Sequence, residues 1–173
     1  MMIESFKENF FGLVEESNNV VVTAHVSPDD DSIASVLGMY GVLKVIFPNK
    51  NIRIIYSGQR VSRYSIFNNF DKIEWVDDIA NHLGDADTLI LLDVSKFSRA
   101  SYIAEALPLI KNTVCIDHHG SAPDKFTLSL IVPEYSSNSE LIYKALGVEE
   151  YLNKELAEIF LLGILGDTGN LTF

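Results

Sequence analysis

The stretch from Val20 to Ser35, VVVTAHVSPDDDSIAS, constrains the fold of this chain more than any other. It begins with the β-branched run Val20–Ala24, which is typical of a short strand buried on both faces of a sheet. The acidic turn Asp29–Asp31 follows, and a helical pattern begins at Ile33. In an open parallel sheet, the turn after a strand lies at the edge where ligands bind. The stretch therefore predicts an α/β fold with a polar site beside its first strand.

Short apolar runs alternate with helical patterns along the rest of the chain. Further strands are predicted at Ile52–Tyr56, Ile73–Val76, Thr88–Leu92, Thr113–Ile116 and Phe126–Val132. Helices are predicted at Ile3–Glu16, Ile33–Phe47 and Arg99–Leu107, from a Ser137–Glu140 capping box to about Leu146, and at Lys154–Leu165. This alternation predicts one doubly wound, parallel sheet. A length of 173 residues is that of about one domain.

Three of the predicted strands run into acidic or imidazole side chains. The first strand runs into His25 and the aspartates, the fourth into Asp93, and the fifth into Asp117–His119. Because parallel strands point their carboxyl ends to one edge, these groups should converge there, and Asp167 after the last apolar helix adds another carboxylate. A plain helix cap would explain the aspartates after the first strand, but not three such clusters.

The convergence of these groups indicates a metal site. Adjacent carboxylates repel one another, and a bound cation offsets that repulsion. Imidazole with excess carboxylate suits Mn²⁺, Mg²⁺ or Co²⁺ better than a structural zinc, since the single cysteine, Cys115, lies in an apolar run. There are more candidate ligands than one ion needs, so we expect two cations about 3.5–4 Å apart. Such a pair favours phosphoester hydrolysis.

Charge and apolar patterning limit the partners. The net charge is −11, from 13 basic and 24 acidic residues, so an electrostatic grip on long duplex nucleic acid is excluded. No apolar run approaches the length of a membrane span, and the first residues lack the pattern of a signal peptide. Cys115 has no partner for an internal disulfide, so we expect a reducing, cytoplasmic setting and no membrane partner.

Four segments, HVSPDDDSIAS, LLDVS, IDHHGS and GDTGNLTF, stand in the order of the four motifs of the DHH phosphoesterase family, which the chain resembles over about residues 20–173. That family includes RecJ-like exonucleases, nanoRNase/pAp phosphatases (pAp is 3′-phosphoadenosine 5′-phosphate), cyclic-dinucleotide phosphodiesterases and family II inorganic pyrophosphatases. The chain is most similar to the nanoRNase/pAp phosphatase group. The resemblance implies a five-stranded, mostly parallel sheet with helices on both faces.

The resemblance also implies roles for individual residues. The implied metal ligands are His25, Asp29 and Asp93 for one cation, and Asp31, Asp93, His118 and Asp167 for the other. Asp93 would bridge the cations, and a hydroxide between them would attack phosphorus in line. His119 would contact the scissile phosphate or the leaving oxygen, and Asp117 would orient the histidines. Arg99 matches an arginine of the family, which implies that its side chain contacts a phosphate or the edge of the sheet. The alternative is a surface salt bridge.

The chain departs from the family pattern near the substrate. Asp30, Ser32 and Ala34 stand where the family usually has Gly, Ala and Gly, and we expect Asp30 to be solvated rather than a ligand. An asparagine that many relatives have after the two histidines is missing, and Asn170 replaces the usual arginine. These departures concern substrate contacts and leave the implied metal ligands intact.

The resemblance implies that residues 1–173 are a single catalytic domain of this family, without its C-terminal substrate-binding domain. Relatives that cleave nucleotides carry a second, smaller domain after the fourth motif, with a glycine-rich segment and basic residues that hold the far end of the substrate. We expect this sequence to be the catalytic part of a longer protein, which would bind metal and turn substrate over weakly. A domain that acts alone is the alternative.

The leading functional hypothesis is a Mn²⁺-dependent phosphoesterase for short oligonucleotides or a small nucleotide such as pAp. Pyrophosphate or polyphosphate is a rival substrate for the same chemistry, and a non-catalytic metal- or nucleotide-binding module is the rival class. The segment Tyr64–Phe70 is expected to be an exposed aromatic loop that contacts a second domain or, in a homodimer, a second copy.

Overall fold

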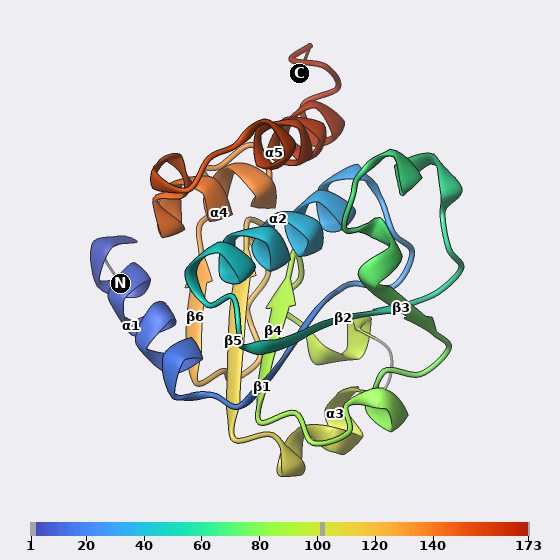
Figure 1. Ribbon diagram of the computed structural model, residues 1–173, viewed down its shortest axis with the longest axis vertical. Coiled ribbons are helices and arrows are strands. Elements are labelled where there is room, and N and C mark those ends of the chain that lie inside the picture. Colours follow the sequence, from blue (N-terminus) through green and yellow to red (C-terminus); the bar gives the residue numbers. More distant parts are fainter. Residues whose placement is uncertain (1–2, 101–102, 173) are drawn as a thin grey trace.

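A single parallel sheet forms the centre of the computed structural model, which describes residues 3–100 and 103–172 (Figure 1). Within these residues six strands pair in the order β3-β2-β1-β4-β5-β6, and every neighbouring pair is parallel. They are β1 (Asn19–Ala24), β2 (Asn51–Ser57), β3 (Ile73–Val76), β4 (Thr88–Leu92), β5 (Asn112–Asp117) and β6 (Leu128–Ile131).

The doubly wound α/β fold is confirmed, with one correction to the sheet implied by the family resemblance. Among the described residues the sheet has six strands rather than five, and it is all parallel rather than mostly parallel. The additional strand, β6, is short and alternates buried with half-buried residues, as an edge strand does. It pairs with β5 from Val114 opposite Leu128 to Asp117 opposite Ile131.

The two faces of the sheet are covered unequally. On one face lie α1 (Ile3–Glu16), α2 (Asp30–Ile46) and α4 (Asn138–Leu146), and α5 (Lys154–Asp167) packs across α2 and α4 (Figure 1). The opposite face is covered by 3-10 turns and the one-turn helix α3 (Ile103–Ala106). The helix predicted over Arg99–Leu107 is therefore reduced to turns and α3, and its residues 101 and 102 lie outside the described ranges.

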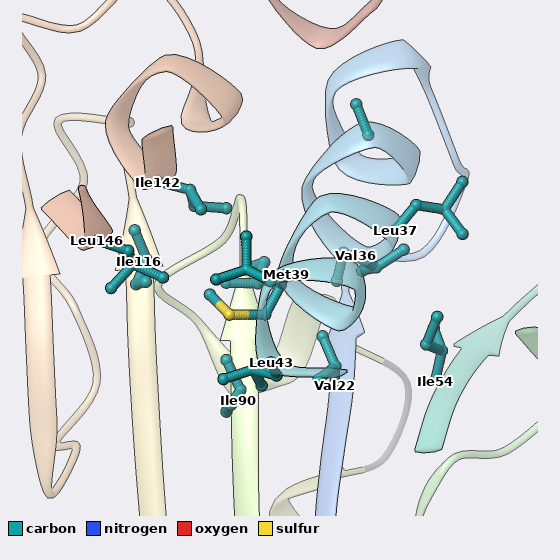
Figure 2. Packing of buried hydrophobic residues seen from close by; sticks show 14 of the residues in the cluster. Val22, Val36, Leu37, Met39, Leu43, Ile54, Ile90, Ile116, Ile142 and Leu146 are labelled. Carbon is teal, nitrogen blue, oxygen red and sulfur yellow. The ribbon is translucent and has the colours of Figure 1, made fainter. Parts of the chain in front are cut away.

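Helix α2 is the centre of the larger core. Figure 2 shows its side chains between the strands and α4; the residues labelled there are Val22, Val36, Leu37, Met39, Leu43, Ile54, Ile90, Ile116, Ile142 and Leu146. Gly38 and Gly41 face α5, since an added Cβ would lie 2.7 Å from the Phe160 ring and 2.6 Å from Leu156 respectively. These two glycines let α5 pack closely on α2. In the described part of the chain, no helix combines the length and the hydropathy that crossing a bilayer requires.

The segment Tyr64–Phe70, which was expected to expose its aromatic rings, buries two of them. Tyr64 and Phe70 are buried, at 2% and 1% exposure, whereas Ile66 is exposed. Tyr64 lies on the 3-10 helix Ser62–Ile66, and the Phe70 ring packs against Trp75 of β3. The expectation of an exposed aromatic loop is therefore wrong, because the aromatic rings of this segment serve the core.

Candidate metal centre

Three neighbouring strands end level with one another. Ala24 of β1 pairs with Leu92 of β4, which pairs with Ile116 of β5. His25, Asp93 and Asp117 are the residues that directly follow these three positions, so the register sets them side by side at the carboxyl edge. The strand order reverses between β1 and β4, which is where doubly wound sheets bind ligands.

Asp29 caps helix α2 with one carboxylate oxygen and faces a histidine with the other. Its Oδ1 accepts the Ser32 N–H at 2.9 Å, and Ser32 Oγ accepts the Asp29 N–H at 3.0 Å, so the two form a capping box. The buried Tyr56 hydroxyl donates to Ser32 Oγ and fixes it from behind. Asp29 Oδ2 lies 3.4 Å from His25 Nε2. The sequence analysis treated a helix cap and a metal ligand as alternative explanations of these aspartates. Asp29 can serve as both, because each role uses a different carboxylate oxygen.

Asp31 is buried against the start of α4. Its Oδ2 accepts the Asn138 N–H at 2.6 Å and its Oδ1 accepts the Ser139 N–H at 2.9 Å. These N–H groups have no partner within their own helix, and they stabilise a negative charge. Burial and the neighbouring Asp93 carboxylate nevertheless raise the pKa of Asp31 to about 7. A cation at this position would reverse that shift.

Asp93 lies between His25 on one side and His118 and His119 on the other. Its Oδ2 lies 3.3 Å from His25 Nε2, while its Oδ1 lies 3.4 Å from His118 Nε2 and 3.5 Å from His119 Nδ1. Its backbone has a φ of 58°, which is uncommon outside glycine. The Asp93 N–H donates to the Ile116 carbonyl at 3.0 Å, and the buried Asn138 amide lies against both groups. The carboxylate therefore has the position that a bridge between two cations requires.

His118 joins Asp93 to the end of α5. Its Nε2 lies 3.2 Å from Asp167 Oδ2 and 3.8 Å from Asp31 Oδ2. Helix α5 extends to Asp167, two residues beyond the predicted Leu165, so Asp167 is its last residue. The Nδ1 atom of His118 faces the Tyr135 carbonyl at 3.3 Å, which orients the ring. Sequence reasoning missed Tyr135, because a backbone carbonyl carries no sequence signal.

Asp117 holds His119. Its buried Oδ1 accepts the His119 backbone N–H at 3.0 Å and lies 2.7 Å from His119 Nδ1, and this contact raises the pKa of His119. The His119 side chain is 44% exposed, and its Nε2 atom has no hydrogen-bond partner within residues 3–100 and 103–172. Asp117 was expected to orient both histidines, but His118 takes its contact from Tyr135 instead.

Two further residues lie near the centre. Arg99 is exposed, and its carbonyl accepts the Val26 N–H at 2.8 Å, which places Arg99 beside His25. No ion pair of Arg99 occurs among the described residues. Asp30 was expected to be solvated rather than a ligand; it belongs to none of the ligand groups and its side chain is 35% exposed, but its Oδ1 also accepts from Arg63 Nη2 at 2.7 Å and from the Tyr64 hydroxyl at 2.6 Å.

The side chains of the centre form three groups whose ligand atoms lie within 4.8 Å of one another. The groups are His25 with Asp29 and Asp93, Asp31 with His118 and Asp167, and Asp93 with His118 and His119. The first group has the residues of one predicted ligand set, and the second has three of the four residues of the other, since Asp93 is grouped with His118 and His119 instead. Asp93 Oδ1 and His118 Nε2 are buried without a hydrogen-bond partner. A cation would satisfy both atoms, so the donor set fits divalent cations.

Protonated histidines balance the carboxylates when no cation is bound. Burial opposes a charge on His25, but its contacts with Asp29 and Asp93 outweigh burial and raise its pKa to about 10. His118 is likewise opposed by burial and raised to a pKa of about 10, through Asp167 and Asp93. A cation that binds to the imidazole nitrogens would displace these protons.

Comparison with known proteins agrees with the four sequence motifs. The family model "DHH family, N-terminal domain" matches residues 19–164. The chain is 31% identical to the bifunctional oligoribonuclease and PAP phosphatase NrnA of Thermus thermophilus, over 89% of this chain and 44% of that protein. It is 28% identical to the Bacillus subtilis protein of the same name, over 90% and 48%.

A solved structure has the same fold. The crystal structure of an exopolyphosphatase-related protein from Bacteroides fragilis matches with a TM-score of 0.85 and 26% identity, over 98% of this chain and 52% of that one. This chain spans less than half the length of the two curated relatives. Because the family model matches residues 19–164, the chain belongs to the DHH phosphoesterase family.

Proposed function

We propose that this chain hydrolyses phosphoester bonds of short oligonucleotides or of a small nucleotide such as pAp, with two divalent cations, Mn²⁺ foremost. The observation that carries the proposal is the position of Asp93, whose two carboxylate oxygens face two different His/Asp groups. Two relatives named as oligoribonucleases and PAP phosphatases support the choice of substrate. Because those relatives are about twice as long as this chain, the proposal concerns the chemistry that residues 1–173 can carry out.

The residues would divide the work between two cation sites. His25, Asp29 and Asp93 would hold one cation, and Asp31, Asp93, His118 and Asp167 the other. A bound pair of divalent cations would supply a water of lowered pKa and offset the charge that develops on the phosphoryl oxygens. Without that positive charge, the carboxylates of this edge would repel a phosphate substrate.

His119 is the residue placed to act on the leaving oxygen. Its contact with Asp117 raises its pKa, which favours the protonated ring near neutral pH. In the protonated ring both nitrogens carry a proton. Asp117 accepts the Nδ1 proton, so the Nε2 proton is the one that can be donated to the leaving oxygen. Asp117 also fixes the ring in position, which lowers the cost of orienting it during the reaction.

Pyrophosphate or polyphosphate is the second candidate substrate. The structurally similar protein from Bacteroides fragilis is described as exopolyphosphatase-related, which favours this alternative. Such substrates need no surface for a nucleoside. Initial rates with pAp, a dinucleotide, pyrophosphate and short-chain polyphosphate, at one Mn²⁺ concentration, separate the two candidates.

The test of the proposal measures bound metal and pAp hydrolysis together. We expect two Mn²⁺ ions per chain and release of phosphate that a chelator abolishes. Asp93→Asn should lower Mn²⁺ content and abolish turnover, because it removes a charge from both cation sites. Asp71→Asn is the matched control, since Asp71 is an exposed carboxylate that pairs with Arg60. Full activity of Asp93→Asn would refute the mechanism, and two bound ions without any turnover would indicate that turnover requires a substrate-binding domain outside residues 1–173.

Two predictions about the setting of the protein stay part of the proposal. A cytoplasmic location rests on Cys115, which is buried and unpaired as expected in a reducing compartment. The homodimer stays a prediction, and with the aromatic rings of residues 64–70 directed inward it rests on Ile66 rather than on them.

A further inference from the structure

Asn138 is a fully buried polar residue at the first position of α4. Helix α4 lies beside α2 on the same face of the sheet (Figure 1). Burying an amide costs free energy unless its donors and its acceptor find hydrogen-bond partners. The partners of Asn138 therefore show what its burial serves.

The main chain at Asn138 holds the carboxylate of Asp31. The Asn138 N–H donates to Asp31 Oδ2 at 2.6 Å, and the next N–H, that of Ser139, donates to Asp31 Oδ1 at 2.9 Å. Each carboxylate oxygen thus has one fixed donor, so the start of α4 sets the orientation of this carboxylate. The same Oδ2 atom lies 3.8 Å from His118 Nε2. The position of Asp31 beside His118 therefore depends on where α4 begins.

The side chain of Asn138 reaches the ends of two strands. Oriented to satisfy its neighbours, the amide donates to the Ile116 carbonyl at 3.0 Å, and its oxygen accepts from the Ser35 hydroxyl at 3.0 Å. The same oxygen lies 3.1 Å from the backbone nitrogen of Asp93. With a φ of 58°, Asp93 has a backbone conformation that persists only where its surroundings fix it. The Asn138 amide is one of the groups in contact with that backbone.

One buried residue thus connects three elements that carry proposed metal ligands. Asp31 lies on α2, Asp93 directly follows β4, and His118 directly follows β5, the strand to which Ile116 belongs. These three ligands, with Asp167, form what we call the second cation site. Residues that support ligands in this way orient them, and their loss weakens metal binding.

We propose that Asn138 is a positioning residue of the centre, which holds Asp31 and the bridging Asp93 at the separation that the second cation site requires. The inference rests on the proposed function, because it concerns one of the two cation sites proposed there. It deepens that function by naming the residue on which binding of a second cation depends.

The ligands of the first cation site are held by other contacts. Asp29 Oδ1 accepts the Ser32 N–H at 2.9 Å, and His25 Nδ1 lies 2.7 Å from the Val26 carbonyl. Two of the three ligands of this site are therefore fixed within their own loop and helix. Loss of the Asn138 side chain should weaken the first site less than the second.

The experiment titrates Mn²⁺ into the metal-free chain and records the electron paramagnetic resonance spectrum of the loaded protein. Asn138→Ala removes the amide and leaves the backbone N–H in place. We expect the second Mn²⁺ to bind about 10- to 100-fold more weakly. At a Mn²⁺ concentration that fills both sites of the unchanged chain, the signal of a magnetically coupled pair should give way to that of an isolated ion. Asn138→Thr should recover part of the affinity, because its hydroxyl can replace part of the amide contacts.

Ser17→Ala is the matched control for the loss of a buried polar contact. Ser17 is 3% exposed, and its Oγ lies 2.6 Å from Thr88 Oγ1 at the start of β4, at the opposite edge of the sheet. Both alanine variants lose a buried hydrogen bond, so urea unfolding in the presence of a chelator should show that both are less stable. Only Asn138→Ala should lose affinity for the second Mn²⁺.

Three results overturn the inference. The first is Asn138→Ala with two Mn²⁺ ions bound at unchanged affinity and an unchanged coupled spectrum. The second is an equal loss of Mn²⁺ affinity in Ser17→Ala, which would assign the effect to general instability. If Asn138→Ala does not fold, Asn138→Thr decides: lowered affinity for the second ion supports the inference, and unaltered binding of both ions is the third overturning result.

Failure of the proposed function gives a different result. If the unchanged chain binds fewer than two Mn²⁺ ions, the two-cation proposal fails and this inference fails with it. If the unchanged chain and Asn138→Ala both bind two ions equally tightly, the inference alone fails.

Discussion

Gly163 on α5 offers a sharp test of how the candidate centre is held together. An added Cβ would lie 2.0 Å from Ser139 Oγ, 2.6 Å from Ser139 Cβ and 2.6 Å from Asp31 Oδ1. Rotation of the Ser139 hydroxyl cannot relieve the contacts with Ser139 Cβ and with the carboxylate. In Gly163→Ala, α5 must therefore move away from the start of α4, and Asp167 at the end of α5 must move with it.

The cost of this change can be worked out from two opposing effects. Overpacking costs about 1–3 kcal/mol, and three contacts below 3 Å place this site at about 3 kcal/mol. Replacing glycine by alanine within a helix returns about 1 kcal/mol. We therefore expect the free energy of unfolding to fall by about 2 kcal/mol. Movement of Asp31 and Asp167 should also weaken one Mn²⁺ site by about 10- to 100-fold.

The assay combines urea unfolding with Mn²⁺ titration and uses Gly12→Ala as control. Gly12 is exposed on α1, and an added Cβ there meets nothing within 4 Å, so alanine should stabilise the protein by up to about 1 kcal/mol. The two Gly→Ala changes should thus have opposite signs. The reasoning is refuted if Gly163→Ala is as stable as the unchanged chain and binds two Mn²⁺ ions with unaltered affinity.

Two further predictions follow from the histidines. In the presence of a chelator, the melting temperature should fall as the pH rises from about 6.5 towards 10. The pKa values of His25 and His118 are about 10 in the folded protein and about 6.5 in the unfolded chain. The stability that their protonation contributes is therefore complete below about pH 6.5 and is lost as the pH rises to about 10. A melting temperature that rises over this range would contradict the charge balance described here. His119→Ala should lower kcat for pAp about 100-fold or more while two Mn²⁺ ions stay bound, as metal analysis would show; loss of an ion would make His119 a ligand instead.

The sequence alone determined the architecture and the grouping of the polar residues. Strand β4 coincides with the predicted Thr88–Leu92. Ser137 caps α4 as predicted, and Asn153 caps α5 directly before the predicted helix start at Lys154. The capping box of α4 is only half present, since Glu140 accepts from Ser136 instead of Ser137. Such features are legible because periodicity and caps depend on neighbours a few residues away. The convergence of His25, Asp93 and the Asp117–His119 run followed from the rule that parallel strands end at one edge.

Only the tertiary structure decided which groups touch. Asp31 receives N–H groups from residues 107 and 108 positions later, and Gly163 makes room for that contact. The Tyr135 carbonyl orients His118, and Asp30 holds Arg63 across the start of α2. None of these pairs leaves a periodic signal, because each depends on how two separate elements pack. Local chemistry thus specified the elements and their polar ends, while packing between elements selected the partner of each charge.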